Sequence, residues 1–232
     1  KFVKVAKDCL AVVAKSDVLL TLGITPTRPD TGYGYIQFTS DKIEEHEKIR
    51  KVKTFTEKPD QELALNFLDS GDFLWNSGMF IWSAKSITLA YRKQLRDMYD
   101  IFEEGKQFYN TSEEAEFIER IFPGCKNISI DYGIMEKSDN VYVYPADFGW
   151  SDLGTWGSLH THLAQDKYRN AVQGKNVLLY DSSDNIIKVP DEKVVVMQGM
   201  NGYIVVENEE VLLICKKENE QQIKKFIVDV KR

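Results

Sequence analysis

The chain has 232 residues, with 43% hydrophobic and 28% charged side chains and a formal net charge of −6 at pH 7. This length and apolar content are enough for a sizeable core, in one large domain or in a domain with a small appendage. The negative charge and the absence of a Lys/Arg block argue against nucleic acid as a partner, and no apolar run is long enough to cross a bilayer.

The cysteines and histidines give no metal-site pattern. Cys9, Cys125 and Cys215 are odd in number and far apart, which predicts reduced core thiols of a cytoplasmic protein. His160 and His162 are two residues apart, a spacing that puts them on different faces of a helix. We expect both histidines to be surface residues rather than ligands.

The chain opens in the middle of an expected helix over residues 2–15, whose apolar side chains recur at helical spacing. A short apolar strand over 18–22 follows. The loop over 25–34 contains two prolines and two glycines, which indicates a stiff, shaped connection. Arg28 in this loop could reach a phosphate or pin the loop, and the sequence leaves both open.

The next expected strand ends at an acidic and a basic residue. Residues 52–56 alternate as a strand does, and they run into Glu57-Lys58-Pro59. Pro59 ends the strand and favours an extended conformation at Lys58, so we expect the Glu57 and Lys58 side chains to point in opposite directions. Taken alone, such a pair is more often an ordinary solvated surface pair.

An amide cluster follows one helix further on. Asp60 is expected to cap that helix, which stops at Gly71. Asn76, Ser77 and Gly78 then interrupt an aromatic run of strand character. An acid, a base and an amide cluster are thus predicted at the ends of rigid elements, where ligand-binding groups are best held.

The region after residue 80 is predicted to be mainly helical. Apolar spacing predicts one long amphipathic helix over 87–102, and Thr111 with Glu114 has the spacing of a capping box. Ser129 or Asp131 would cap a short helix after that. Helix capping is a sufficient reason for Asp131, and a sugar contact is the lesser alternative.

A strand over 141–145 leads to Asp152, which lies between Trp150-Ser151 and Leu153-Gly154-Thr155-Trp156. Two large rings and a glycine can hold a carboxylate in a partly dry place. Mg²⁺ takes few protein ligands, so one fixed Asp can be a substantial share of a magnesium site. The alternative is that Asp152 serves as a helix N-cap.

A composition shift near residue 170 predicts two domains, residues 1–168 and 169–232. From residue 176 onward, short β-branched runs predict a small β-rich appendage of hairpin or solenoid character. A closing helix over about 218–230 places Ile223, Phe226 and Ile227 on one face, for packing on the appendage or on a second subunit.

Four blocks of the sequence, in order, resemble the sugar-1-phosphate nucleotidyltransferases, and most closely the mannose-1-phosphate guanylyltransferases. They are residues 23–36 (GITPTRPDTGYGYI), 54–80 (TFTEKPDQELALNFLDSGDFLWNSGMF), 129–137 (SIDYGIMEK) and 149–156 (GWSDLGTW). The resemblance implies an α/β fold, the C-terminal part of a three-layer nucleotidyltransferase sandwich that is Rossmann-like and GT-A-like, followed by the β-rich appendage with its terminal helix. The family's Gly-rich nucleotide loop and a further metal-binding Asp are not found, so we expect the nucleotide-binding residues upstream of Lys1.

The resemblance also implies a reaction. The phosphate of mannose 1-phosphate would attack the α-phosphorus of GTP, giving GDP-mannose and pyrophosphate with the help of Mg²⁺ or another divalent cation. It assigns catalysis to Lys58 and Asp152, with Asp152 as the metal ligand. The substrate-binding residues that it implies are Gly34, Glu57, Lys58, Asn76, Ser77, Gly78 and Asp131.

Three alternatives stay open. Another sugar 1-phosphate or another nucleotide could be the substrate. The chain could instead be a non-catalytic sugar-nucleotide sensor or regulatory subunit. A purely structural β-appendage protein is hardest to reconcile with the four ordered blocks. Family tails of this kind often take part in homo-oligomers, although nothing in the sequence specifies a number of subunits.

Overall fold

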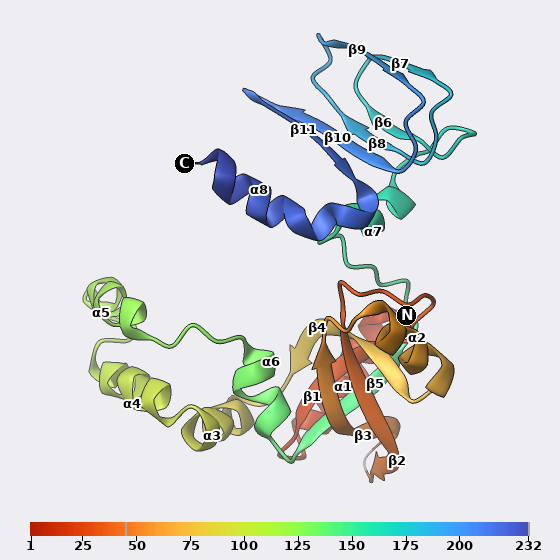
Figure 1. Ribbon diagram of the computed structural model, residues 1–232. Coiled ribbons are helices and arrows are strands. Elements are labelled where there is room, and N and C mark those ends of the chain that lie inside the picture. Colours follow the sequence, from red (N-terminus) through yellow and green to blue (C-terminus); the bar gives the residue numbers. More distant parts are fainter. Residues whose placement is uncertain (45, 232) are drawn as a thin grey trace. The chain divides into compact units, whose positions relative to one another are not determined.

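The computed structural model describes residues 1–44 and 46–231 and divides into two compact units, Lys1–Trp150 and Ser151–Arg232 (Figure 1). Each unit has its own sheet and its own buried apolar clusters. In the described part of the chain, no helix is both long and apolar enough to cross a membrane. The predicted domain boundary after residue 168 stays a prediction.

The first unit is built on five strands that close into a barrel in the order β1-β4-β2-β3-β5. Strands β1 and β5 are parallel and the other neighbours are antiparallel. Every residue of β1 is buried, which is why its sequence shows no polar alternation. The strands are β1 (Leu19–Ile24), β2 (Gly34–Ile43), β3 (His46–Glu57), β4 (Phe73–Ile81) and β5 (Val141–Ala146).

The α/β class is confirmed, but the described residues of this unit do not form the layered, open sheet that the resemblance implies. Strands β2 and β3 are long, and β3 reaches β5, where Arg50 pairs with Val143 and Lys51 with Tyr142. This contact closes the sheet on itself. A closed barrel has no free sheet edge to cover.

Two helices pack beside the barrel as the sequence predicts. Helix α1 (Phe2–Val13) buries Cys9, which belongs to the main core cluster. Helix α2 (Gln61–Ser70) begins after Asp60, whose Oδ1 accepts a hydrogen bond of 2.8 Å from the Leu63 amide. It ends at Gly71, where φ is +76°. Both predicted caps are therefore confirmed.

The single long helix expected over 87–102 is wrong. It is divided at Leu95, where φ is −132° and ψ is 56°, into α3 (Ala84–Gln94) and α4 (Arg96–Glu104). The Leu95 side chain packs on the cluster around Ile134, so the break follows a tertiary contact rather than a local signal.

In Figure 1, α4 and α5 (Glu114–Ile121) lie away from the barrel, and α6 (Ile130–Gly133) lies nearer to it. Short 3₁₀ turns occupy Gly105–Gln107, Phe122–Gly124 and Met135–Lys137.

The second unit is a small parallel β-solenoid, one of the two forms predicted for the appendage. Strands β6, β8 and β10 are parallel neighbours, and Ala171, Ile186 and Ile204 are in register and fully buried. Strand β11 completes this sheet, and β7 pairs with β9 in a second sheet. The elements are α7 (Trp156–His162), β6 (Ala171–Gln173), β7 (Asn176–Tyr180), β8 (Ile186–Lys188), β9 (Val194–Gln198), β10 (Tyr203–Asn208), β11 (Val211–Lys216), a 3₁₀ turn Lys217–Gln222 and α8 (Ile223–Val230).

A pair of buried asparagines holds one corner of the solenoid. Asn185 Nδ2 donates to Asn170 Oδ1 and to the Met200 carbonyl, both at 2.9 Å, and its Oδ1 accepts from the Tyr203 amide at 2.8 Å. Asn170 Nδ2 in turn donates to the Ser182 carbonyl. These amides satisfy backbone groups where the chain turns between strands.

The expectation that both histidines lie on the surface is wrong for His160, while His162 is exposed. His160 is 6% exposed, and its Nε2 donates to the Arg169 carbonyl at 2.8 Å. Lys217 Nζ lies 3.4 Å from His160 Nδ1 and 2.6 Å from Asp184 Oδ2. A partly buried polar network thus fastens α7 within its unit.

The three cysteines are free thiols, as predicted. Cys9 and Cys215 are buried, whereas Cys125 is half-buried. Burial raises the pKa of Cys9 to about 12. This thiol therefore stays protonated at neutral pH and is unreactive.

Candidate functional site

Three residues that the resemblance assigns to substrate binding meet at one end of the barrel. Gly34 begins β2 and pairs with Glu57 at the end of β3. A Cβ atom on Gly34 would overlap Oε2 of Glu57 and would lie 3.5 Å from Cβ of Asn76 on β4. The structure therefore brings Gly34, Glu57 and Asn76 together, and the missing side chain at Gly34 gives the Glu57 carboxylate its place.

Lys58 has a backbone that the sequence does not predict. Its φ is +47°, and its amide donates a 3.2 Å hydrogen bond to the Tyr33 carbonyl. The expected extended conformation is therefore wrong, as is the expectation of opposed side chains, because Lys58 Nζ lies 3.1 Å from Oε1 of Glu57. The Tyr33 carbonyl and the burial of Pro59 hold a conformation that is costly for a residue other than glycine. Such strain is most common at functional positions.

The amide cluster is fixed by bonds within the barrel. Asn76 Oδ1 accepts from the Gly78 amide at 3.2 Å, and Gly78 has a φ of +68°. Ser77 Oγ donates to the Leu22 carbonyl of β1 at 2.6 Å. Ser77 thus fastens β4 to β1, and a sugar contact by Ser77 or by the Gly78 backbone stays a prediction.

Of the two residues that the sequence offers as the cap of α6, Asp131 is not the one used. Ser129 takes that part, since its Oγ accepts from the Tyr132 amide at 3.4 Å. Asp131 lies in the first turn of α6, and its Oδ1 accepts a 2.7 Å hydrogen bond from Asn76 Nδ2. Asp131 therefore belongs to the same group as Asn76, although the two are far apart in sequence.

The carboxylates of this group influence one another. Packing of protein around Glu136, and then the charges of Asp131 and Glu57, raise the pKa of the Glu136 carboxyl above its usual value. Sequence patterns assign Glu136 no role, although it lies within the block 129–137. The site combines several hydrogen-bond acceptors with the Lys58 ammonium group, which suits a ligand that has hydroxyl groups and an anionic end.

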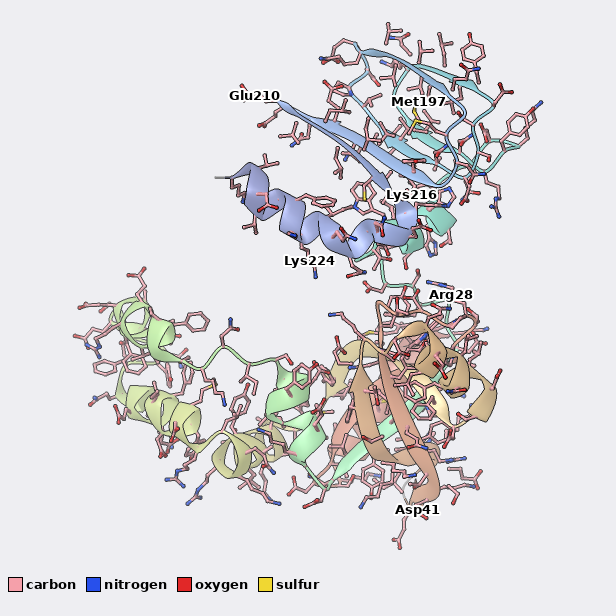
Figure 2. The ribbon with its side chains drawn as sticks, viewed as in Figure 1. Arg28, Asp41, Met197, Glu210, Lys216 and Lys224 are labelled. Carbon is pink, nitrogen blue, oxygen red and sulfur yellow. The ribbon has the colours of Figure 1, made fainter. Side chains whose placement is uncertain are left out.

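Arg28 lies at the same end of the barrel, opposite the end marked by Asp41 (Figure 2). Its Nη2 lies 2.7 Å from Oδ2 of Asp30 and donates to the Tyr33 hydroxyl at 3.3 Å. The guanidinium carbon also lies 5.2 Å from the centre of the Trp75 ring. These contacts pin the loop that carries Tyr33, which is one of the two roles that the sequence left open.

Asp152 belongs to the second unit. Its Oδ1 accepts a 2.8 Å hydrogen bond from the Gly154 amide. It is not the N-cap of α7, because Thr155 Oγ1 accepts from the Ser158 amide at 3.1 Å. The local turn thus orients the Asp152 carboxylate without using it as a cap.

Asp152 is the residue that the resemblance assigns to a divalent cation. Within residues 1–44 and 46–231 there is no group of three His, Cys, Asp or Glu side chains that could hold a metal ion. Asp152 supplies a carboxylate whose orientation the Gly154 amide fixes, and Mg²⁺ commonly binds one or two carboxylates together with water and substrate phosphates. A cation held by Asp152 would therefore need water or phosphate oxygens as further ligands.

Comparisons with known proteins identify the family of the chain. A model of the nucleotidyl transferase family matches residues 6–169, and a model of the MannoseP isomerase/GMP-like beta-helix domain matches residues 174–229. The chain belongs to the nucleotidyl transferase family. The predicted resemblance to the mannose-1-phosphate guanylyltransferases is confirmed by the relatives described next.

Alginate biosynthesis protein AlgA of Pseudomonas fluorescens is 34% identical over 220 residues, which are 93% of this chain and 44% of that protein. Mannose-1-phosphate guanylyltransferase of Klebsiella pneumoniae is 34% identical over 219 residues, or 92% of this chain and 45% of that protein. A crystal structure described as mannose-1-phosphate geranyltransferase from Thermus thermophilus is similar with a TM-score of 0.79 at 27% identity, covering 99% of this chain and 66% of that one. The chain spans about half the length of the curated relatives it matches.

Proposed function

We propose that this protein is a sugar nucleotidyltransferase that makes GDP-mannose and pyrophosphate from GTP and mannose 1-phosphate. The observation that carries the proposal is the gathering of Glu57, Lys58, Asn76 and Asp131 beside Gly34. The names of its relatives, several of which are mannose-1-phosphate guanylyltransferases, support the choice of sugar and nucleotide.

In this proposal Lys58 binds the phosphate of the sugar. Its ammonium group is a compact cation, and its side chain is 51% exposed, so a phosphate in solvent can reach it. The ion pair with Glu57 does not prevent this, because partly exposed pairs are weak and exchange partners at little cost. The left-handed backbone at Lys58 directs its side chain from a fixed point at the strand end.

Glu57 and Asn76 bind the hydroxyl groups of the sugar. A carboxylate accepts hydrogen bonds, and an amide both donates and accepts them. Because Gly34 has no side chain, the Glu57 carboxylate can lie beside Asn76, where both could reach the same sugar. In this proposal, one end of the barrel supplies both the cation that binds the phosphate and the hydrogen-bonding groups that bind the sugar hydroxyls.

The chemistry demands positioning more than proton abstraction. A phosphate monoester is already a competent nucleophile near neutral pH, so in-line attack depends on bringing two anions together in a fixed geometry. Lys58 offsets part of that negative charge. Asp152 would hold the divalent cation, which when bound neutralises charge on the phosphates.

Lys58→Ala tests the proposal. We expect kcat/KM for mannose 1-phosphate to fall by about a hundredfold, the scale of losing a charge-assisted contact of a few kcal/mol. Lys48→Ala is the matched control, since Lys48 is an exposed lysine near the start of β3, the strand that ends directly before Lys58. An unchanged kcat/KM in Lys58→Ala would remove Lys58 from the phosphate site.

A further inference from the structure

The hydrogen bond between Asn76 of β4 and Asp131 of α6 joins two residues that are 55 positions apart in sequence. At 2.7 Å it has the length of a bond to an ionised acceptor. The helix of Asp131 already has its cap in Ser129, so capping does not account for this carboxylate. Its contact with Asn76 is what distinguishes it from an ordinary surface acid.

This bond fixes which way the Asn76 amide faces. Asp131 accepts from Nδ2, and the Gly78 amide donates to Oδ1 at 3.2 Å, so each end of the amide has a partner of opposite type. A flipped amide would set Oδ1 against the carboxylate and Nδ2 against an N–H group, and both contacts would be repulsive. The two bonds use one hydrogen of Nδ2 and one lone pair of Oδ1. Asn76 would offer a ligand the second Nδ2 hydrogen and the second Oδ1 lone pair.

We infer that Asp131 is a positioning residue that locks the Asn76 amide so that it can donate to one hydroxyl and accept from the neighbouring hydroxyl of a hexose. The ligand class is a pyranose with two adjacent hydroxyl groups, and Asp131 itself does not touch the sugar. This inference rests on the proposed function, because it assigns a role within the same sugar site.

Asn76 is half-buried, and its two hydrogen bonds restrict its side chain before any ligand binds. A side chain that is held by two bonds loses little further rotational freedom when a sugar binds, so more of the contact energy appears as affinity. Without Asp131 the amide samples other rotamers and both orientations. Sugar affinity then falls while the barrel, whose strands are paired independently, stays folded.

The test measures binding of mannose 1-phosphate to the whole 232-residue chain by calorimetry. We expect Asp131→Ala to raise Kd by about tenfold, the loss typical of one hydrogen bond. Asp131→Asn is expected to restore binding, because its Oδ1 can still accept from Asn76 Nδ2. Asp139→Ala is the matched control, since the Asp139 carboxylate is 91% exposed and pairs with Lys93 outside the site. If Asp131→Ala melts too low for the assay, Asp131→Ser, whose side chain is too short to reach Asn76, replaces it with the same expectation.

A double-mutant cycle separates positioning from direct contact. If Asp131 acts only through Asn76, the Asn76→Ala/Asp131→Ala protein binds no more weakly than Asn76→Ala alone. Additive losses would overturn the inference in favour of a direct sugar contact by Asp131. Equal binding by Asp131→Ala and the parent would overturn the inference and leave the proposed function standing. No binding by the parent chain would overturn both.

Discussion

Replacing Gly34 by alanine places one methyl group where the Glu57 carboxylate lies. The new Cβ would overlap Oε2 of Glu57, so that oxygen has to move by about 1 Å to reach an ordinary contact distance. The shift also disturbs the pair of Glu57 with Lys58, whose atoms are 3.1 Å apart. A misplacement of about 1 Å among substrate-positioning groups can cost about a hundredfold in rate, and we expect a loss of that order in kcat/KM for mannose 1-phosphate.

The same substitution should leave the fold nearly intact. The Glu57 side chain is 30% exposed and flexible, and Gly34 does not have the left-handed backbone that would strain an alanine. We expect the free energy of unfolding to change by less than about 1 kcal/mol.

The assay for this prediction is steady-state pyrophosphate release together with thermal unfolding. Gly124→Ala is the matched control, because a Cβ there would meet no described atom within 4 Å and the backbone is not left-handed. If Gly34→Ala folds and turns over mannose 1-phosphate as the parent does, the close approach of Gly34 and Glu57 is not part of the site.

Three further predictions concern other parts of the chain. Asp152→Asn keeps an oxygen for the Gly154 amide, so we expect turnover to be lost with the fold retained; rates equal to the parent at saturating Mg²⁺ would remove Asp152 from the metal site. Asn185→Ala removes three hydrogen bonds at one corner of the solenoid, including the one that the Tyr203 amide donates, and should lower the stability of the solenoid by about 3 kcal/mol in denaturant unfolding; Asn176→Ala, on an exposed residue, is the control, and equal losses in the two variants would contradict the account. The pKa of Glu136 is raised in the folded state, so its ionised form costs stability above the ordinary glutamate pKa and costs none below it. Glu136→Gln should therefore raise the melting temperature at about pH 8 and leave it unchanged at about pH 4, and a gain at the lower pH would refute the assignment.

Local features were predictable from the sequence because their causes act over a few residues. The Asp60 cap and the stop at Gly71 depend on side chains within one turn of the helix end, and both are present. Strand β3 ends at Glu57, two residues before Pro59, the residue that was expected to end it. The candidate residues at strand ends followed from the same local signals.

Distant contacts decided the rest. Lys58 takes a left-handed backbone while its amide bonds to the Tyr33 carbonyl, a group far outside any local window. Asp131 contacts Asn76 across 55 positions, and no local rule could prefer that contact over a helix cap. His160 is buried by a network whose other members lie on later strands and turns.

The repeat length of the solenoid varies along the chain, so the sequence shows no fixed period. Asn170 and Asn185 occupy equivalent corners 15 positions apart, whereas Ser182 and Met200 are linked across 18. A repeat that changes length after so few turns gives no fixed period to find in the sequence. The shared pattern of an asparagine followed by two apolar residues, at 170 and at 185, was the available signal.

The most direct test of the central claim is pyrophosphate release by a protein that contains this chain together with the expected nucleotide-binding residues, when it is given GTP, mannose 1-phosphate and Mg²⁺, with ATP and glucose 1-phosphate as substitutes. The proposed function predicts release and GDP-mannose formation with the GTP and mannose 1-phosphate pair, and a loss of both in Lys58→Ala. Equal release with ATP or glucose 1-phosphate, or no release with any pair, would contradict it.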